Sequence, residues 1–481
     1  MNFAIVRYLI GWMLGIESIF LLLPALTAVI YGEPELPAYL IAAAISLAGA
    51  ALLCHRKPKN TRFYAREGYV TVALCWLILA VIGALPFVLS REIPFFIDAL
   101  FETVSGFTTT GATILGDVEA LSHASMLWRC LTHWVGGMGV LVFMLIVLPL
   151  AGGQTIFLMR AESPGPSVSK MSPRMRDTAT ILYAIYFGLT VLQMILLLIG
   201  GMPLFDAICV SLGTAGTGGF GNWNDSIAHY NSAYLQNVIT VFMILFGINF
   251  SAYFLILTRK FRQAFRIEEI RVYLGVIFVF AGLIAFNVRP MFGSLRESFH
   301  HALFQVASII TTTGFSTVDF DQWPTFSRAL LVLLMFIGAC AGSTGGGIKC
   351  SRILLLGKSV KKELMCLIHP RLVRVNKMDG QRVPHEVMRS INVFVVAYAF
   401  IFILSLLIIS LNCEDLVTCF TSVATTLNNV GPGLSLCGPT CNFGFFPPLS
   451  KGVLIFDMLA GRLELFPMLL LFTPGTWQRN K

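Results

Sequence analysis

Long apolar runs, separated by short polar or basic segments, recur along the whole chain. A helix of roughly 20 apolar residues crosses the hydrocarbon core of a bilayer, which is about 30 Å thick. Runs of about this kind lie at 8–30, 38–54, 69–90, 126–150, 178–200, 234–258, 272–288, 327–341, 390–411 and 451–474. The pattern predicts ten membrane spans, and an even number places both chain ends on one side of the membrane.

Four shorter apolar segments lie between pairs of these spans, and each ends in a turn rich in Thr, Asn or Gly. They occupy 98–111, 206–218, 301–314 and 419–431. Each has only about ten helical residues, which is too few to cross the membrane. Four copies on the same side of the membrane indicate an internal repeat. We therefore predict four re-entrant half-helices, each followed by a loop at membrane depth.

The repeat also predicts how the chain is organised. We expect an all-α polytopic membrane protein in which four pseudo-symmetric units surround one central pore. Each unit is a helix, a re-entrant pore loop and a second helix, and an N-terminal two-helix preface precedes them. The predicted parts are the preface at 1–68 and pore repeats at 69–176, 177–268, 269–386 and 387–481.

Composition and charge support a membrane protein with a defined topology. Of the 481 residues, 56% are hydrophobic and 12% are charged, whereas a soluble domain has roughly 25% charged residues. The net charge of +9 comes from basic residues that concentrate in 55–68, 160–176, 259–271 and 349–389. This is the positive-inside bias, which places both termini in the cytoplasm and requires no nucleic-acid partner.

The residue types in the four loops indicate which ion the pore would conduct. None is acidic or basic, whereas acidic rings suit divalent cations and basic rings suit anions. Backbone carbonyl and Thr hydroxyl oxygens remain, and Gly permits the positive φ that turns carbonyls inward. We expect a filter that binds K⁺ at Thr109, Thr110, Gly111, Gly216, Thr217, Gly218, Thr312, Thr313, Gly314, Asn429, Val430 and Gly431.

Several motifs carry a resemblance to a known family. They are Thr-Thr-Thr-Gly-Ala-Thr at 108–113, Arg-Ala-Glu-Ser-Pro-Gly-Pro at 160–166, Gly-Ser-Thr-Gly-Gly-Gly at 342–347, Asn-Asn-Val-Gly-Pro at 428–432 and Gly-Arg-Leu-Glu at 461–464. Over essentially its whole length the chain resembles the superfamily of Trk, Ktr and plant high-affinity potassium transporters. The resemblance is strongest to the Trk-system potassium uptake proteins of the bacterial TrkH/TrkG type.

The resemblance implies potassium uptake across the bacterial inner membrane by a multi-pass chain with a gated filter. K⁺ would be the transported ion, and no organic cofactor is expected. The resemblance also implies a homodimer with one pore in each protomer, surrounded by membrane lipid. A TrkA-like cytoplasmic nucleotide-binding regulatory ring would dock on the basic inner face, especially at 349–389. Taken alone, the charge indicates only a basic cytoplasmic surface, and topology is an alternative explanation for part of it.

A glycine-rich segment interrupts the second span of the third repeat. Residues 338–347 cannot form a firm helix, because each Gly costs about 1 kcal/mol there. Following the resemblance, we expect a flexible loop under the filter that gates conduction, and a contact of small residues between helices is the alternative. A phosphate-binding loop is excluded, because Ile348 stands where Lys is required. The expected gate residues are Gly342, Ser343, Thr344, Gly345, Gly346, Gly347 and Arg462.

Arg462 would lie near the middle of the bilayer. It follows Lys451 by 11 residues, or about 16 Å along a helix. An unsolvated charge at that depth costs at least about 2.5–3.5 kcal/mol. We expect Arg462 to face the pore, contact residues 338–347 and act as an electrostatic barrier. The alternative is a structural Arg that is satisfied by carbonyls or by Asp457 away from the pore axis.

Other classes of function are less well supported. The eight His residues form no HExxH motif and the chain has no GxSxG motif, so we do not expect an enzyme. A symporter that couples potassium to sodium or protons is the competing transport mechanism, although such carriers usually have ionisable groups at the midplane. Cys437 and Cys441 lie in a predicted outer loop, where either a disulfide or free thiols would be compatible with the sequence.

Overall fold

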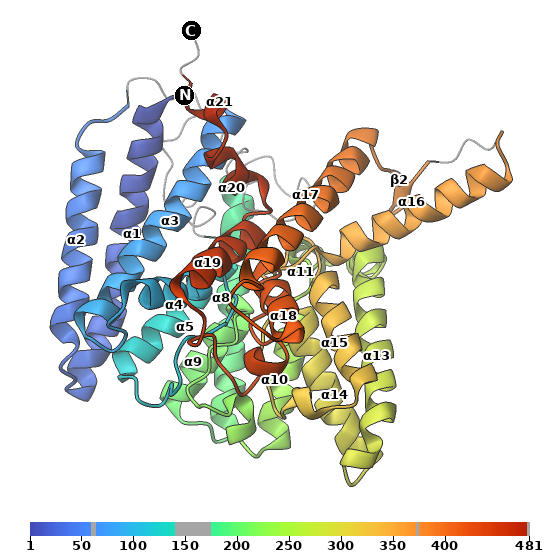
Figure 1. Cartoon of the computed structure of the whole chain (residues 1–481), viewed down its shortest axis with the longest axis horizontal. Helices are drawn as coiled ribbons and strands as arrows, with labels where there is room; N and C mark the ends of the chain where they lie inside the picture. The colour runs from blue at the N-terminus through green and yellow to red at the C-terminus, as the bar shows by residue number, and fades with distance from the viewer. Residues whose placement is uncertain (59–63, 140–174, 372–374, 479–481) are drawn as a thin grey trace.

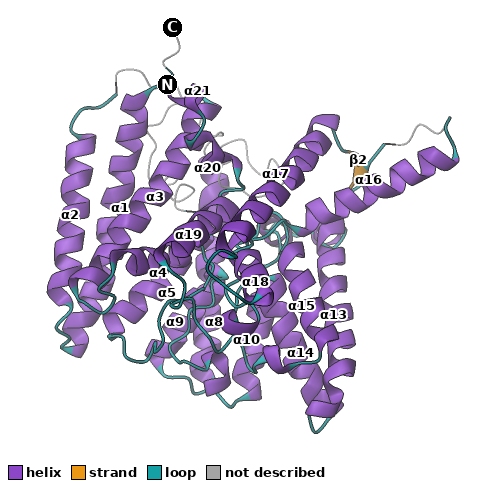
Figure 2. Cartoon of the chain, in the orientation of Figure 1, coloured by secondary structure: helices purple, strands orange, loops and turns teal. Residues whose placement is uncertain are grey.

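The computed structural model describes residues 1–58, 64–139, 175–371 and 375–478. The motif at 160–166 and the second half of the span predicted at 126–150 lie outside these ranges. Within them, six helices are long and apolar enough to cross a membrane, and one bent pair makes a seventh. Apart from a hairpin of two-residue strands, β1 (Lys377–Met378) and β2 (Gln381–Arg382), the regular structure described is helical (Figure 2). The predicted all-α membrane fold is confirmed.

The preface consists of two helices that pack closely through small residues. They are α1 (Phe3–Tyr31) and α2 (Leu36–Cys54). A Cβ added at Gly11 would lie 2.9 Å from the Leu53 Cβ, and one added at Gly49 would lie 3.0 Å from the Leu14 Cδ1. Lipid offers little hydrophobic driving force between helices, so close approach at small residues stabilises such a pair.

Four units follow, and each has a long first helix, a short helix and a second helix. The first helices are α3 (Ala65–Leu89), α8 (Met175–Ile199), α13 (Glu268–Val288) and α17 (His385–Ile409). The short helices are α4 (Phe96–Phe107), α9 (Leu204–Gly216), α14 (Leu295–Ile310) and α18 (Leu416–Leu427). The second helices are α5 (His123–Gly137), α10 (Ala233–Phe246), α15 (Thr325–Ile337) and α19 (Pro448–Arg462). In Figure 1 the units follow one another around a central region in the order of their colours.

The second helices are interrupted, which corrects the continuous spans predicted at 234–258 and 451–474. In the third repeat α15 ends where residues 338–347 are predicted to interrupt the span at 327–341. α10 is followed by α11 (Phe250–Leu257) at an angle of 92°. α15 ends at Ile337, and α19 ends at Arg462 before α20 (Phe466–Leu471). The freed backbone groups bond to one another, as in the bonds from the Phe250 N–H to the Gly342 carbonyl (3.0 Å) and from the Cys340 N–H to the Gly247 carbonyl (3.1 Å). Hydropathy cannot detect such breaks, because the residues stay apolar on both sides of them.

The molecule has two different ends. The start of α1 and α21 (Pro474–Trp477) lie at the end that we term the terminal face, at the top of Figure 1. α16 (Cys350–Ile368) extends sideways from the body on the right and rises toward that face. The turns between α1 and α2 and between α13 and α14 lie at the opposite end, which we term the mouth face. The remaining short helices are η1 (Ser226–His229), α12 (Phe261–Ala264), η2 (Arg289–Met291), η3 (Phe320–Gln322) and η4 (Ser435–Cys437).

Candidate ion filter and gate

The four short helices end in the same backbone geometry. A residue with a left-handed φ of 55–58° follows each helix, namely Thr109, Thr217, Thr312 and Asn429. The N–H of the next residue bonds to the carbonyl five residues earlier at 2.8–3.0 Å, from Thr110, Gly218, Thr313 and Val430. This is a common way to end a helix. Because the left-handed conformation costs a non-glycine residue about 1–2 kcal/mol, its recurrence indicates that the surroundings fix all four loops.

One residue further on, each loop has a glycine with positive φ. These are Gly111 (81°), Gly219 (74°), Gly314 (85°) and Gly431 (100°). The structure therefore aligns Thr109-Thr110-Gly111 with Thr217-Gly218-Gly219, and the predicted triplet Gly216-Thr217-Gly218 is displaced by one residue. Gly216 belongs to the last turn of α9. The error arose because three glycines crowd this loop, and only the backbone shows which of them has the positive φ.

The four glycines close a ring. A Cβ added at any of them would come within 2.6 Å or less of a carbonyl oxygen in the next loop. The pairs are Gly111 with Gly218, Gly219 with Thr313, Gly314 with Val430 and Gly431 with Thr110. Each pair joins equivalent positions of neighbouring loops, and the fourth pair returns to the first loop. Only a residue without a side chain fits at this distance, so the ring requires glycine at all four places.

In two loops the residue directly before the ring glycine is a Thr whose hydroxyl group is hydrogen-bonded within its own loop. The Thr110 hydroxyl bonds to the Thr108 hydroxyl at 2.8 Å, and the Thr313 hydroxyl bonds to the Thr311 hydroxyl at 2.7 Å. The Thr109 hydroxyl is buried and has no hydrogen-bond partner among the described residues. Carbonyl oxygens are therefore the main oxygen atoms that these loops offer to an ion, and Thr109 is the clearest additional candidate.

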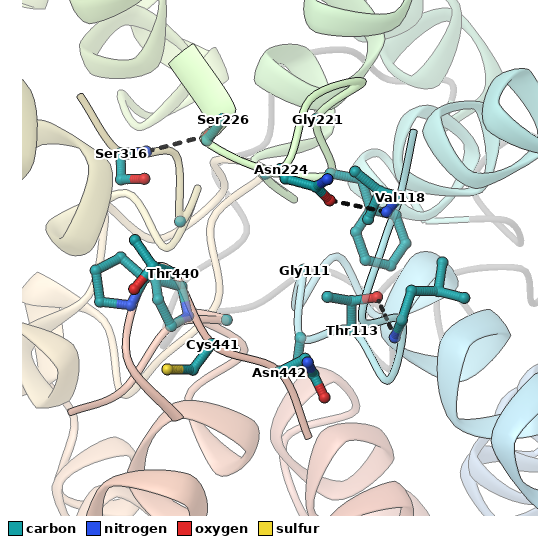
Figure 3. A pocket seen from close by; sticks show the side chains of 18 of the residues that line it. Gly111, Thr113, Val118, Gly221, Asn224, Ser226, Ser316, Thr440, Cys441 and Asn442 are labelled. Atoms are coloured by element: carbon teal, nitrogen blue, oxygen red, sulfur yellow. Dashed lines mark hydrogen bonds between the residues drawn. The ribbon is translucent and has the colours of Figure 1, made fainter. Parts of the chain in front are cut away.

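A cavity lies on the mouth face of the ring (Figure 3). Its lining includes all four ring glycines and the loops that follow them. Hydrogen bonds across these loops hold the cavity open, for example from the Val118 N–H to the Asn224 side chain (2.9 Å). The Asn224 amide also donates to Asp117 at 2.8 Å, which lowers the pKa of that exposed carboxyl group. The cavity gives the ring an open approach from the mouth face.

Residues 338–347, which we term the under-filter segment, pack against the other side of the ring. The Gly346 N–H donates to the Thr312 hydroxyl at 2.7 Å, and a Cβ added at Gly346 would lie 2.7 Å from the Asn428 carbonyl oxygen. Glu269 accepts hydrogen bonds from the Ala341 N–H (2.7 Å), within the segment, and from the Ser351 N–H (3.0 Å), in the first turn of α16. A non-helical stretch therefore lies directly beneath the third and fourth loops.

Arg462 joins this segment to the end of α5. Its guanidinium donates to the carbonyls of Thr344 (2.8 Å), Gly136 (2.5 Å) and Gly137 (2.8 Å). The predicted contact with residues 338–347 is therefore present. Asp457, the other partner considered, accepts from the Ser405 hydroxyl at 2.7 Å. Whether Arg462 acts as a barrier to ions stays a prediction.

Comparison with known proteins decides the family. The family model for TrkH, described as a cation transport protein, matches residues 37–478. The chain belongs to the TrkH family. The Trk system potassium uptake protein TrkH of Salmonella typhimurium is 38% identical over 99% of this chain and 100% of its own length. TrkG of Escherichia coli K12 is 33% identical over 98% of both chains. The crystal structure of the potassium transporter TrkH from Vibrio parahaemolyticus superposes with a TM-score of 0.89 at 33% identity, covering 99% of this chain and 100% of that one.

Membership of the TrkH family confirms the resemblance seen in the sequence. The relatives are named as transport proteins, so the expectation that this chain is not an enzyme is also confirmed. The predicted ion-binding and gating roles of individual residues stay predictions, although the structure brings the residues of all four loops, the under-filter segment and Arg462 together.

Sequence reasoning missed the residues that support the loops in this TrkH-family chain. Glu102 and Arg129 form a buried ion pair at 2.8 Å, and Glu102 also accepts from the Ile114 N–H at 3.0 Å. His133 on α5 contacts both the first and the second loop. A signal for them existed, because charged or titratable side chains inside apolar spans are rare and usually have a specific partner.

Proposed function

We propose that this TrkH-family chain takes up potassium through the ring of four loops. The observation that carries the proposal is the closure of the ring, in which each glycine abuts a carbonyl oxygen of the next loop. Closely spaced neutral oxygens can replace the hydration shell of a monovalent cation. The names of the relatives, potassium uptake proteins and a potassium transporter, support potassium as that cation.

Two further features support a cation site at the ring. All four short helices direct their C-terminal ends toward it, and the partial negative charge of a helix C-terminus favours a cation. The Thr109 hydroxyl is buried beside the ring without a partner among the described residues. The proposed binding set is Thr109, Thr110, Gly111, Thr217, Gly218, Gly219, Thr312, Thr313, Gly314, Asn429, Val430 and Gly431.

In this proposal the gate consists of the under-filter segment and Arg462. The segment packs under two of the four loops, and it lacks the internal hydrogen bonds of a helix. Arg462 places a positive charge beside the under-filter segment, because its guanidinium donates to the Thr344 carbonyl. Conduction would require the segment to move and the charge to be displaced, and a regulatory subunit would control both.

The surroundings of the pore follow from the same proposal. The chain would lie in the bacterial inner membrane, with the basic terminal face, which includes exposed Arg56, Lys57 and Lys361, in the cytoplasm. A TrkA-like nucleotide-binding ring would dock on that face. The chain would form a homodimer surrounded by lipid. A contact on the cytoplasmic side is supported by α16, where Val360, Leu364 and Leu367 are exposed at helical spacing on a helix that extends away from the body (Figure 1).

Rubidium uptake into liposomes that contain the purified chain alone tests the function. Without a sodium or proton gradient, rubidium should enter down its own gradient, and potassium should block it far better than sodium. Gly219→Ala should abolish uptake, because the ring has no room for a Cβ there. Gly221→Ala is the matched control, since its nearest neighbours lie 3.7 Å away. Uptake that appears only with an imposed sodium or proton gradient would overturn passive conduction and favour the symporter.

A further inference from the structure

One of the four loops lacks a side chain that the other three have. The residue before the ring glycine is Thr110, Thr313 or Val430 in three loops, but it is Gly218 in the second loop. The φ of Gly218 is not positive, so the backbone itself does not require glycine there. A different constraint must explain the missing side chain.

The imidazole ring of His133 fills the place of that side chain. A Cβ added at Gly218 would collide with the ring and would lie 2.5 Å from its Cδ2 atom. His133 comes from α5, in the first repeat, and is fully buried. Close packing leaves no room for both groups. Gly218 and His133 are therefore complementary, although 85 residues separate them along the chain.

Both ring nitrogens of His133 bond to the filter region. Nδ1 lies 2.7 Å from the carbonyl oxygen of Gly106, near the end of the first short helix. The Phe220 N–H, directly after the second ring glycine, donates to Nε2 at 3.2 Å. A carbonyl can only accept, so Nδ1 carries the proton and Nε2 is the acceptor. A neutral imidazole thus connects the first loop to the second.

Aromatic and backbone contacts hold this imidazole in place. Its ring stacks on the Phe220 ring with centroids 4.2 Å apart. Beside it, a Cβ added at Gly216 would collide with the His133 carbonyl group, and one added at Gly136 would collide with the Phe107 carbonyl group. α5 therefore touches the ends of both α4 and α9. His133 has little freedom to shift without moving one of the two loops.

The junction between the fourth and first loops is built differently. There Asn429, itself a loop residue, donates to the Thr110 hydroxyl at 3.0 Å and to the Met458 carbonyl at 2.8 Å. At the junction between the first and second loops, the second loop has Gly218 and contributes no side chain. The bridging group comes from outside the loops instead.

We propose that His133 is a positioning residue for selectivity, which sets the second filter loop in place of the side chain that Gly218 lacks. This inference rests on the proposed function of the ring as a potassium filter. Without the imidazole, the second loop loses its lateral support and its bond at Phe220. The carbonyl oxygen of Gly218, which abuts Gly111 in the ring, would then be held less firmly. Discrimination between potassium and sodium depends on how such oxygens are held.

The test measures how potassium and sodium compete with rubidium uptake in liposomes, for the wild type and a set of variants. The measure of selectivity is the sodium concentration that halves rubidium uptake, divided by the potassium concentration that does so. In His133→Ala this ratio should fall at least tenfold, while the protein still conducts rubidium. Gly218→Thr alone should lose uptake, because the threonine collides with the imidazole. The double variant His133→Ala/Gly218→Thr should recover much of the selectivity, because it restores the side chain that two other loops have. His369→Ala, at the exposed end of α16, is the control and should match the wild type.

Two conservative variants test separately the two hydrogen bonds of the His133 imidazole. In His133→Asn the amide can still donate toward the Gly106 carbonyl, and in His133→Gln the amide oxygen can reach toward the Phe220 N–H, so each variant should lose only part of the selectivity. If His133→Ala cannot be purified, these two variants decide, and wild-type selectivity in both would overturn the proposal. Unchanged selectivity in a well-folded His133→Ala would overturn it too. If the wild type itself does not prefer potassium, the filter proposal fails and this inference fails with it.

Discussion

Two halves of the ring are supported in contrasting ways. The first and second loops rest on α5, a regular helix whose Gly136 and His133 touch the ends of α4 and α9. The third and fourth loops rest on the under-filter segment, which is not helical and makes its contacts through Gly345 and Gly346. The fourth loop also touches a helix, because a Cβ added at Gly461 of α19 would collide with the Leu427 carbonyl group. The supports therefore repeat the pseudo-fourfold symmetry of the loops only in part.

The difference shows how one pore can be both fixed and gated. A helix satisfies its own backbone hydrogen bonds, so α5 can move only as a whole. Such a movement would break both bonds of His133 to the filter region. The under-filter segment bonds to separate groups, such as Glu269 and the Thr312 hydroxyl. Each of those bonds contributes about 0.5–1.5 kcal/mol, or more when charged. We expect rigidity on the α5 side and movement on the other.

The largest effect is expected on the rigid side. In Gly136→Val the new side chain would collide with the Phe107 carbonyl group at the end of the first short helix. We expect neither α4 nor α5 to yield, so the folded state should be destabilised by more than ordinary overpacking, which costs about 1–3 kcal/mol. The expected result is little or no folded protein in detergent, measured by size-exclusion chromatography. Gly188→Val, which meets nothing within 4 Å, is the control. A normal yield of Gly136→Val would contradict a rigid α5 support.

Arg462→Ala tests the link between the two sides. Its guanidinium donates to carbonyls of α5 and of the under-filter segment, so the variant removes these bonds together with a half-buried positive charge. Rubidium flux through the chain alone should rise several-fold at a normal yield. Arg462→Lys retains the charge and should give a smaller increase. Flux equal to that of the wild type would rule out the barrier and leave a structural Arg.

The sequence predicted the repeat more reliably than the supports. The loops at 98–111 and 301–314 share Ala-Leu-Phe and Thr-Thr-Thr-Gly, and such similarity reveals a repeat without any structure. The register of the second loop could not be read in this way, because Gly216, Gly218 and Gly219 look alike in a sequence. The positive φ that distinguishes Gly219 depends on contacts with Thr313 from another repeat.

The breaks in the second helices illustrate the same limit. Residues 338–347 could be recognised, because five glycines in ten residues disfavour a helix. The bend between α10 and α11 has a single Gly247, and it depends on partners such as the Gly342 carbonyl in the third repeat. Local composition shows where a helix is weak, whereas contacts between repeats decide where it breaks.

A smaller change is expected from Gly346→Ala on the movable side. Its Cβ would lie 2.7 Å from the Asn428 carbonyl oxygen and 2.9 Å from the Asn429 Cβ. The under-filter segment should yield, because it is not helical, and rubidium flux should increase modestly at a normal yield. Gly357→Ala on α16, which meets nothing within 4 Å, is the matched control. Loss of folded protein, as expected for Gly136→Val, would show that both sides of the ring are equally rigid.

The smallest effect concerns how the short helices begin, where the two halves differ again. The helices of the third and fourth loops are capped by the side chains of Ser294 and Asp415, whereas the residues before α4 and α9, Phe95 and Pro203, provide no such bond. Asp415 accepts from the Val417 N–H (3.1 Å), the Thr418 N–H (3.0 Å) and the Thr418 hydroxyl (2.5 Å). Helix capping of this kind contributes about 1 kcal/mol, so Asp415→Ala should lower the thermal midpoint slightly and leave rubidium flux unchanged at pH 7.

The pH dependence of that variant provides the control. The hydrogen bond from Thr418, followed by that from Ser435, lowers the pKa of Asp415 to about 2, below the roughly 3.9 of an unfolded chain. A carboxylate with a depressed pKa stabilises the folded state above the unfolded value, and this stabilisation is lost as the pH falls through the folded value. The difference between wild type and Asp415→Ala should therefore be constant from pH 5 to 8 and shrink between about pH 4 and 2. A difference that changes near neutral pH would point to another group and would remove Asp415 from the contrast between the two halves.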